Sequence, residues 1–360
     1  MKKLSFLIPV IAVIIMNVVC DKDHPKNDPC EGLPPDSCQV DTCVDDTCNS
    51  CDGIPGQWEF LGLAGENVSA IAIHLTDPRI FYVCTGTKLF KTRDCGATWD
   101  TLLVGGHWFT DIDIDPTNPN VIYAAPHEIV KSTDGGNTWV NASQGIFLDP
   151  ETRVDEVVID PNNTSILYAG TGGFFGGDMY KSTNGGDSWT SIATRNELKE
   201  TNTALAIDPN NNIIYVGNVN GSVLISTNNG LTWDTTTIKN WRGIVEQLYV
   251  DHGEVYACIG PLGIWNSTDA GANWSNLNAG LSSYSSVKIE KISTTQEMFA
   301  LSGRPGVEWA LFNKQVTDSS WTKFKVLQEG NPLGQNDFVI TLDRRQILSG
   351  PYGLYRYTFP

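Results

Sequence analysis

Positively charged residues are scarce in this sequence. Its 24 lysine and arginine residues face 41 aspartate and glutamate residues, which gives a formal net charge of −17 at pH 7. Because clustered cations are needed to hold phosphate groups, this balance argues against nucleic acid and anionic lipid headgroups as partners. The five histidines are scattered without metal-ligand spacing, and P-loop, dinucleotide-binding, HExxH and GxSxG motifs are all missing. We therefore expect neither a cofactor nor a metal.

The one long apolar run lies at the N-terminus. It extends from Leu4 to Met16 behind two lysines, is too short for a stable membrane span, and is typical of a cleaved secretion signal. Cys20 resembles the lipid acceptor of a bacterial lipoprotein, although Val18 and Val19 stand where that family prefers a small residue. We expect residues 1–19 to be a signal peptide and lipid on Cys20 to anchor the protein to the extracytoplasmic side of a bacterial membrane. Plain secretion and a retained signal anchor are the alternatives.

Residues 20–55 are expected to form a Cys-rich acidic linker that does not fold alone, because large apolar side chains are few. Export favours disulfides over zinc, and a metal site in the cysteine cluster is the alternative. Besides Cys20, the number of linker cysteines is odd, so at least one must pair outside, and Cys95 is the expected partner. Cys84 and Cys258 should be buried thiols in matching strands. The other linker cysteines are Cys30, Cys38, Cys43, Cys48 and Cys51.

One nine-residue motif recurs along the chain. Its central aspartate, or the asparagine that replaces it, recurs after 40, 50, 44 and 41 residues. Four short strands with their turns take about 40 to 50 residues, which is the length of a propeller blade. The copies are KTRDCGATW (91–99), KSTDGGNTW (131–139), KSTNGGDSW (181–189), ISTNNGLTW (225–233) and NSTDAGANW (266–274).

Two further units are degenerate. One ends in Asp318 and Trp321, and the last, at 339–359, stops before any fourth strand. The missing strand is expected at 56–63, where Trp58 begins an apolar alternation. The sequence therefore predicts an all-β fold, a single seven-bladed β-propeller over residues 56–360 whose N-terminal strand closes the last blade.

The motif resembles the Asp-box, or BNR repeat, of sialidases, xyloglucan-degrading hydrolases, sortilin-type receptors and photosystem assembly factors. The resemblance covers residues 56–360, and five matches at blade spacing make it specific for the fold. These families share no single activity, so it leaves the function open.

We expect the motif to be structural. Asp134 can accept hydrogen bonds from its own turn, Gly136 permits the positive φ of the turn, and Trp139 packs between sheets. Asn184 and Asn228 replace the aspartate in two copies, and an amide cannot act as a general acid or nucleophile. The expected framework residues are Asp94, Asp134, Asn184, Asn228 and Asp269, with Trp99, Trp139, Trp189, Trp233 and Trp274.

The rim opposite the motif turns is expected to bind the ligand. It is formed by links between blades and by loops joining second to third strands, and these segments are rich in aromatic and charged residues. Such surfaces suit sugars or peptide side chains, although many of the rings could instead pack against neighbouring blades. The candidate ligand-binding residues are His107, Trp108, Phe109, Arg153, Phe174, Phe175, Trp241, Arg242, Tyr284 and Trp309.

Two carboxylates are the candidate catalytic residues. Aligned on the aspartates that end the first strands, Asp111 and Glu156 take equivalent positions in adjacent blades and would face one end of the central channel. Such a pair can divide acid and base roles, as in glycosidases. Binding of water or a cation is the alternative.

Three functions are compatible with these features. We expect a monomeric, non-catalytic binding or scaffold protein for glycan or protein ligands; the alternatives are a glycoside hydrolase of the Asp-box type and a photosystem-assembly-factor-like protein. Sialidases resembling this chain have an Arg-Ile-Pro motif and an arginine triad, whereas this chain has Arg79-Ile80-Phe81 and no such triad. The xyloglucan enzymes use two propellers around a cleft, and the sequence accommodates one.

Overall fold

The computed structural model describes most of the chain from Cys51 onward. The exceptions are residues 52, 54–56, 149–150, 174–176, 195–197, 199–200, 239–242, 282–285, 293–294, 305–307, 328–337, 341–345, 350–352 and 359–360. Residues 1–50 also lie outside the described part, and with them Cys20, Cys30, Cys38, Cys43 and Cys48. Among the described residues, no helix is long and apolar enough to cross a membrane.

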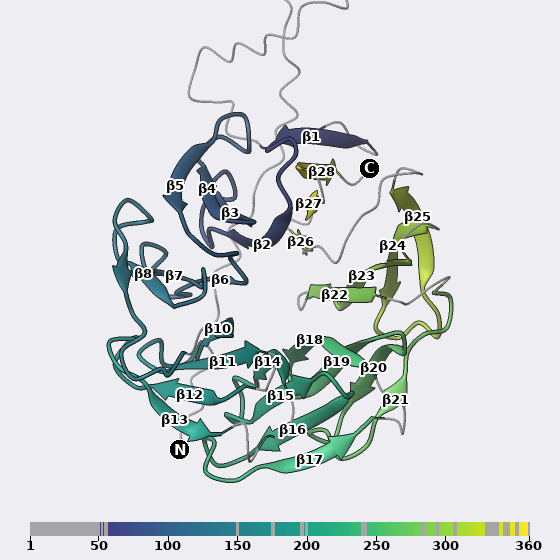
Figure 1. The fold of residues 1–360 in the computed structure, drawn as a ribbon. Coiled ribbons are helices and arrows are strands. Elements are labelled where there is room, and N and C mark those ends of the chain that lie inside the picture. The colour runs from purple at the N-terminus through teal and green to yellow at the C-terminus, as the bar shows by residue number, and fades with distance from the viewer. Residues whose placement is uncertain are drawn as a thin grey trace, which may run out of the picture. The chain divides into compact units, whose positions relative to one another are not determined.

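The protein is an all-β β-propeller (Figure 1). Its described residues form seven four-stranded antiparallel sheets, and in six of them the strands follow one another in chain order. These six are β2–β5, β6–β9, β10–β13, β14–β17, β18–β21 and β22–β25. The strands are β1 (Trp58–Gly62), β2 (Val68–Ile73), β3 (Phe81–Thr85), β4 (Lys88–Thr92), β5 (Asp100–Val104), β6 (Ile112–Ile114), β7 (Ile122–Ala124), β8 (Val130–Ser132), β9 (Val140–Asn141), β10 (Thr152–Ile159), β11 (Leu167–Gly173), β12 (Met179–Ser182), β13 (Thr190–Ala193), β14 (Asn202–Ile207), β15 (Ile214–Asn218), β16 (Ser222–Ser226), β17 (Asp234–Thr237), β18 (Ile244–Asp251), β19 (Glu254–Gly260), β20 (Gly263–Ser267), β21 (Ser275–Asn276), β22 (Ser286–Ile292), β23 (Glu297–Arg304), β24 (Glu308–Gln315), β25 (Thr322–Leu327), β26 (Phe338–Ile340), β27 (Gln346–Ser349) and β28 (Leu354–Thr358).

The remaining sheet joins the two ends of the described chain. Its order is β1–β28–β27–β26, with Trp58 opposite Tyr357 in the antiparallel pair of β1 and β28. Arg356 of β28 is almost fully buried, forms an ion pair with Glu59 and donates a hydrogen bond to the Cys51 carbonyl oxygen. The innermost strand β26 lies beside both β2 and β22.

Buried second strands form much of the core. Their tyrosines are at most 2% exposed, as expected for aromatic side chains in strands covered on both faces. Two of the hydroxyl groups donate to a backbone carbonyl oxygen in the motif turn of the next sheet: Tyr82 to Gly135 at 3.1 Å and Tyr123 to Gly185 at 2.8 Å. Lys131 Nζ donates to the same Gly185 oxygen at 2.6 Å. The buried ring set is Tyr82, Tyr123, Tyr168, Tyr215 and Tyr256.

The repeated motif forms a turn between the third and fourth strands. In the copy at 131–139, Asp134 Oδ1 accepts hydrogen bonds from the Thr138 backbone N–H and the Ser132 hydroxyl, both at 2.8 Å. Gly136 has φ of 89°, and its N–H donates to Ser132 Oγ at 2.8 Å. In the third copy Asn184 accepts the equivalent hydrogen bond from the Ser188 N–H at 3.0 Å. Aspartate and asparagine therefore close the same turn.

A disulfide fastens the start of the described chain to one of these turns. Cys51 is bonded to Cys95, the expected partner, whereas Cys84 and Cys258 are buried cysteines that take no part in this bond. Cys95 has φ of 62°, and Gly135 has φ of 70° at the corresponding position of the next copy. In the same turn Trp99 Nε1 donates to the Leu61 carbonyl oxygen at 2.8 Å, which ties the sheet of β2–β5 to β1 itself.

Candidate functional site

The two candidate catalytic carboxylates lie on neighbouring innermost strands. Asp111 directly precedes β6 and Glu156 lies in β10, each four residues before the aspartate that ends its strand segment, Asp115 or Asp160. β6 and β10 lie beside each other. The structure therefore brings together the two residues that strand alignment predicted to be equivalent.

Asp111 bridges two sheets. Its Oδ1 accepts a hydrogen bond from the Ile112 N–H at 2.8 Å, and its Oδ2 accepts one from the Val157 N–H of β10, also at 2.8 Å. Asp113 repeats this pattern two residues later, because its Oδ2 accepts from the Ile159 N–H at 3.1 Å. These hydrogen bonds fix both carboxylates against the neighbouring strand.

Glu156 is held against the next sheet in the same way, and its pKa is shifted. Burial raises the pKa of Glu156 well above its ordinary value, and the negative charge of Asp111 raises it further. A hydrogen bond from the Leu205 backbone and the positive charge of Lys288 oppose this shift. Glu156 therefore favours its protonated form beside a second carboxyl group.

A β-bulge sets the direction of the residue before Glu156. The pairing of β10 with β11 shifts register between Val154 and Glu156, so Asp155 is the extra residue of the strand. Asp155 forms an ion pair with Arg153 at 2.8 Å. Burial raises the pKa of Asp155, and Arg153 opposes that rise. Two acidic residues, Asp155 and Glu156, thus lie at this register shift of β10.

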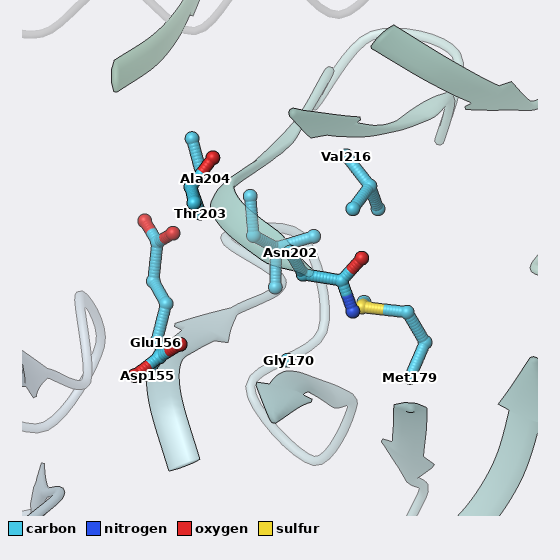
Figure 2. Close-up of a pocket in the computed structure, with 9 residues that line it drawn as sticks. Asp155, Glu156, Gly170, Met179, Asn202, Thr203, Ala204 and Val216 are labelled. Carbon is cyan, nitrogen blue, oxygen red and sulfur yellow. The ribbon is translucent and has the colours of Figure 1, made fainter. Parts of the chain in front are cut away.

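A small pocket lies between the sheets that contain β10 and β14. Figure 2 shows the Glu156 side chain extending toward Thr203 and Ala204, with the Asn202 amide beside Met179. The side-chain oxygens of Asn202 and Thr203 have no hydrogen-bond partner among the described residues. The pocket has room for about one water molecule, so a sugar ring near Glu156 would have to lie outside it. Its lining residues are Asp155, Glu156, Gly170, Met179, Asn202, Thr203, Ala204, Leu205 and Val216.

An aromatic surface lies on the segments next to these carboxylates. The Trp108 side chain is 59% exposed, and the adjacent His107 is also exposed. The His107 ring lies against that of His127, with centroids 4.5 Å apart and planes inclined by 33°. Burial lowers the pKa of His127, and His107 lowers it further. His127 was not among the sequence candidates, because nothing in its local sequence distinguishes it from an ordinary loop residue.

One predicted ligand-binding residue is wrong. Phe109 was expected on the exposed rim, but its side chain is 1% exposed and packs in the core with Ile112 and Ala124. Burial removes the apolar surface of this large ring from water, which stabilises the fold, whereas the ring would stay hydrated on an exposed loop. Arg153 is exposed, as the rim prediction requires. Phe174, Phe175, Trp241, Arg242, Tyr284 and the side chain of Trp309 lie outside the described residues.

Metal ligation has no support in the described part of the chain. No group of three or more His, Cys, Asp or Glu side chains there could hold a metal ion.

Comparisons with known proteins support the β-propeller fold, and one relative is a probable xyloglucanase. A probable oligoxyloglucan-reducing end-specific xyloglucanase of Neosartorya fischeri is 27% identical over 158 residues, covering 37% of this chain and 19% of that protein. The structure of a GH74 xyloglucanase from Xanthomonas campestris has a TM-score of 0.67 at 16% identity, covering 84% of this chain and 53% of that one. The chain thus spans about half of that structure and about a fifth of the curated relative.

Two further structures match over nearly their whole length. YCF48 bound to D1 peptide has a TM-score of 0.62 at 15% identity, covering 86% of this chain and 97% of that chain. YCF48 from Cyanidioschyzon merolae has the same TM-score at 14% identity, covering 84% of this chain and 98% of that chain. No protein-family profile matches the sequence. At these identities the structural matches establish the β-propeller fold alone.

Proposed function

We propose that the protein is a glycoside hydrolase of the β-propeller type, in which Glu156 is the general acid and Asp111 the general base. The observation that carries this proposal is the pair of neighbouring carboxyl groups on β10 and before β6, of which Glu156 favours its protonated form. The partial sequence similarity to a xyloglucanase supports a polysaccharide substrate. This reverses our expectation of a non-catalytic module.

The two carboxyl groups would divide the proton transfers of the reaction. Glu156 gives its proton to the glycosidic oxygen as the bond from that oxygen to the anomeric carbon breaks. Asp111 takes a proton from the water molecule that adds to the anomeric carbon. The backbone hydrogen bonds to Asp111 hold its carboxylate in one orientation, which keeps the pair aligned during the reaction.

The architecture and location belong to the same proposal. The seven sheets are blades of one closed ring, and the pairing of β1 with β28, together with the contacts of β26 with β2 and β22, supports that closure. Lipid on Cys20 anchors the ring outside a bacterial cytoplasmic membrane, where the Cys51–Cys95 disulfide is stable.

A non-catalytic binding module is the second candidate. Gln247 of β18 occupies the position equivalent to Asp111 and Glu156, and its Oε1 accepts a hydrogen bond from the Ile289 N–H at 2.8 Å. A residue at this position can therefore hold neighbouring sheets together without carrying a carboxyl group. The nearly complete overlap with YCF48, which was solved with a bound D1 peptide, also favours this candidate.

Release of reducing ends from a panel of polysaccharides distinguishes the two candidates. The hydrolase proposal predicts turnover of at least one β-linked glucan, including xyloglucan. Binding of such a polymer without any release of reducing ends supports the second candidate.

A further inference from the structure

The residues next to the carboxylate pair form a rigid aromatic surface, which we define as Trp108, His107 and His127. Trp108 belongs to the segment between β5 and β6, three residues before Asp111. His127 belongs to the segment between β7 and β8, and its carbonyl oxygen accepts a hydrogen bond from the Val154 N–H at 2.8 Å, two residues before Glu156. The surface therefore lies at the same strand ends as the two carboxylates.

The segment that presents Trp108 is held at both ends. The Gly105 N–H donates to the Thr87 carbonyl oxygen at 2.7 Å, and the Phe109 N–H donates to the Gly86 carbonyl oxygen at 2.8 Å. The buried Phe109 ring anchors the segment in the core, and Thr110 Oγ1 donates to the Val154 carbonyl oxygen at 2.8 Å. An exposed indole on such a segment loses little conformational entropy when a ligand covers it.

The two histidines add polar groups beside the indole. His127 has φ of 101°, a backbone conformation that costs energy for a residue other than glycine and is often retained at functional sites. Burial and the neighbouring His107 lower the pKa of His127 below the ordinary histidine value, which favours the neutral imidazole. A neutral imidazole offers one N–H donor and one nitrogen acceptor, which suits hydroxyl groups.

We propose that Trp108, His107 and His127 form a subsite for one pyranose ring of a β-linked glucan, with the indole stacked on the sugar and the imidazoles bonded to its hydroxyl groups. A pyranose whose hydroxyl groups are all equatorial has two flat C–H faces, and such a face covers an indole as an apolar surface does. A neutral sugar also avoids the repulsion that an anionic ligand would meet from a chain of net charge −17. This inference rests on the proposed function, because it assigns the substrate class of the same site.

The test measures cellohexaose binding by calorimetry in the Glu156→Gln background, which prevents turnover during the titration. Trp108→Ala is expected to weaken binding about tenfold or more, and His127→Ala several-fold. Leu231→Ala is the matched control, because Leu231 is 82% exposed in a motif turn and its loss should leave the affinity unchanged. Maltohexaose, with α-linkages that turn successive rings away from one plane, should bind more weakly.

The outcomes separate this inference from the proposed function. Unchanged cellohexaose affinity in Trp108→Ala, with glucan hydrolysis by the wild type, overturns the subsite and leaves the hydrolase intact. A tenfold loss of affinity in a protein that hydrolyses nothing supports the subsite and overturns the hydrolase. No binding of cellohexaose to the Glu156→Gln protein overturns the subsite.

Discussion

The Asp111 carboxylate accepts a hydrogen bond from the Val157 N–H at 2.8 Å, across the boundary between two sheets. The residue before Val157 is Glu156, whose pKa is raised by burial and then by Asp111 itself. One contact thus joins neighbouring sheets and places two carboxyl groups next to each other. The same hydrogen bond stabilises the fold and holds a candidate catalytic group. Experiments must therefore distinguish a loss of stability from a loss of activity.

The motif aspartate tests the framework role. Asp134→Ala should lower the melting temperature, because the Thr138 N–H and hydroxyl and the Ser132 hydroxyl lose their acceptor. Asp134→Asn is the matched control and should melt close to the wild type, since Asn184 and Asn228 close the same turn in other copies. Scanning calorimetry measures the melting temperatures of the three proteins. Equal values for wild type and Asp134→Ala would be incompatible with this role.

Much of the fold was predictable from the sequence because its signals are local and repeated. The motif turn, the Asp-Pro strand ends and the pairing of Trp58's segment with the last sheet each depend on a few adjacent residues, and repetition reinforces them. Cys95 was predictable as a disulfide partner because it replaces a turn glycine and the linker count is odd.

The site was harder to predict because it depends on contacts between sheets. Phe109 and Trp108 are adjacent aromatic residues in one segment, yet one is buried and the other exposed, and only the packing of β6 and β7 decides which. His127 joins His107 from a separate segment, and the register shift at Asp155 leaves no signature in the sequence. Strand alignment placed Asp111 and Glu156 at equivalent positions because both are counted from a recurring aspartate, and β6 and β10 are neighbouring strands.

The disulfide should stabilise the closure of the chain. Cys51 and Cys95 are 44 residues apart, and removal of a cross-link over such a loop is expected to cost about 2 to 4 kcal/mol in unfolding free energy. Cys51→Ser should show this loss in denaturant titration and should no longer respond to a reducing agent. The double variant with Cys95→Ser should lose no more than Cys51→Ser alone. A wild type whose stability is unaffected by complete reduction of this bond would refute the prediction.

Asp113 should make stability fall as the pH rises. Burial, and then Asp111, raise the pKa of Asp113 from 3.8 to about 7. Between these values the folded protein holds a proton that the unfolded chain has released, so the unfolding free energy decreases with increasing pH in this window. Asp113→Asn is permanently neutral, and its stability relative to the wild type should increase from pH 4 to pH 8. A difference between the two proteins that is the same at both pH values would contradict this.

The release of reducing ends from xyloglucan, compared between wild type, Glu156→Gln and Asp111→Asn, tests the central claim most directly. We predict turnover by the wild type and a loss of about 100-fold or more in Glu156→Gln, because the amide cannot donate the proton that the leaving oxygen needs. Circular dichroism should show that Glu156→Gln remains folded, and Asp111→Asn should lose activity to a similar extent. Xyloglucan hydrolysis at the wild-type rate by folded Glu156→Gln would contradict the account, as would a wild type that releases no reducing ends from any β-glucan.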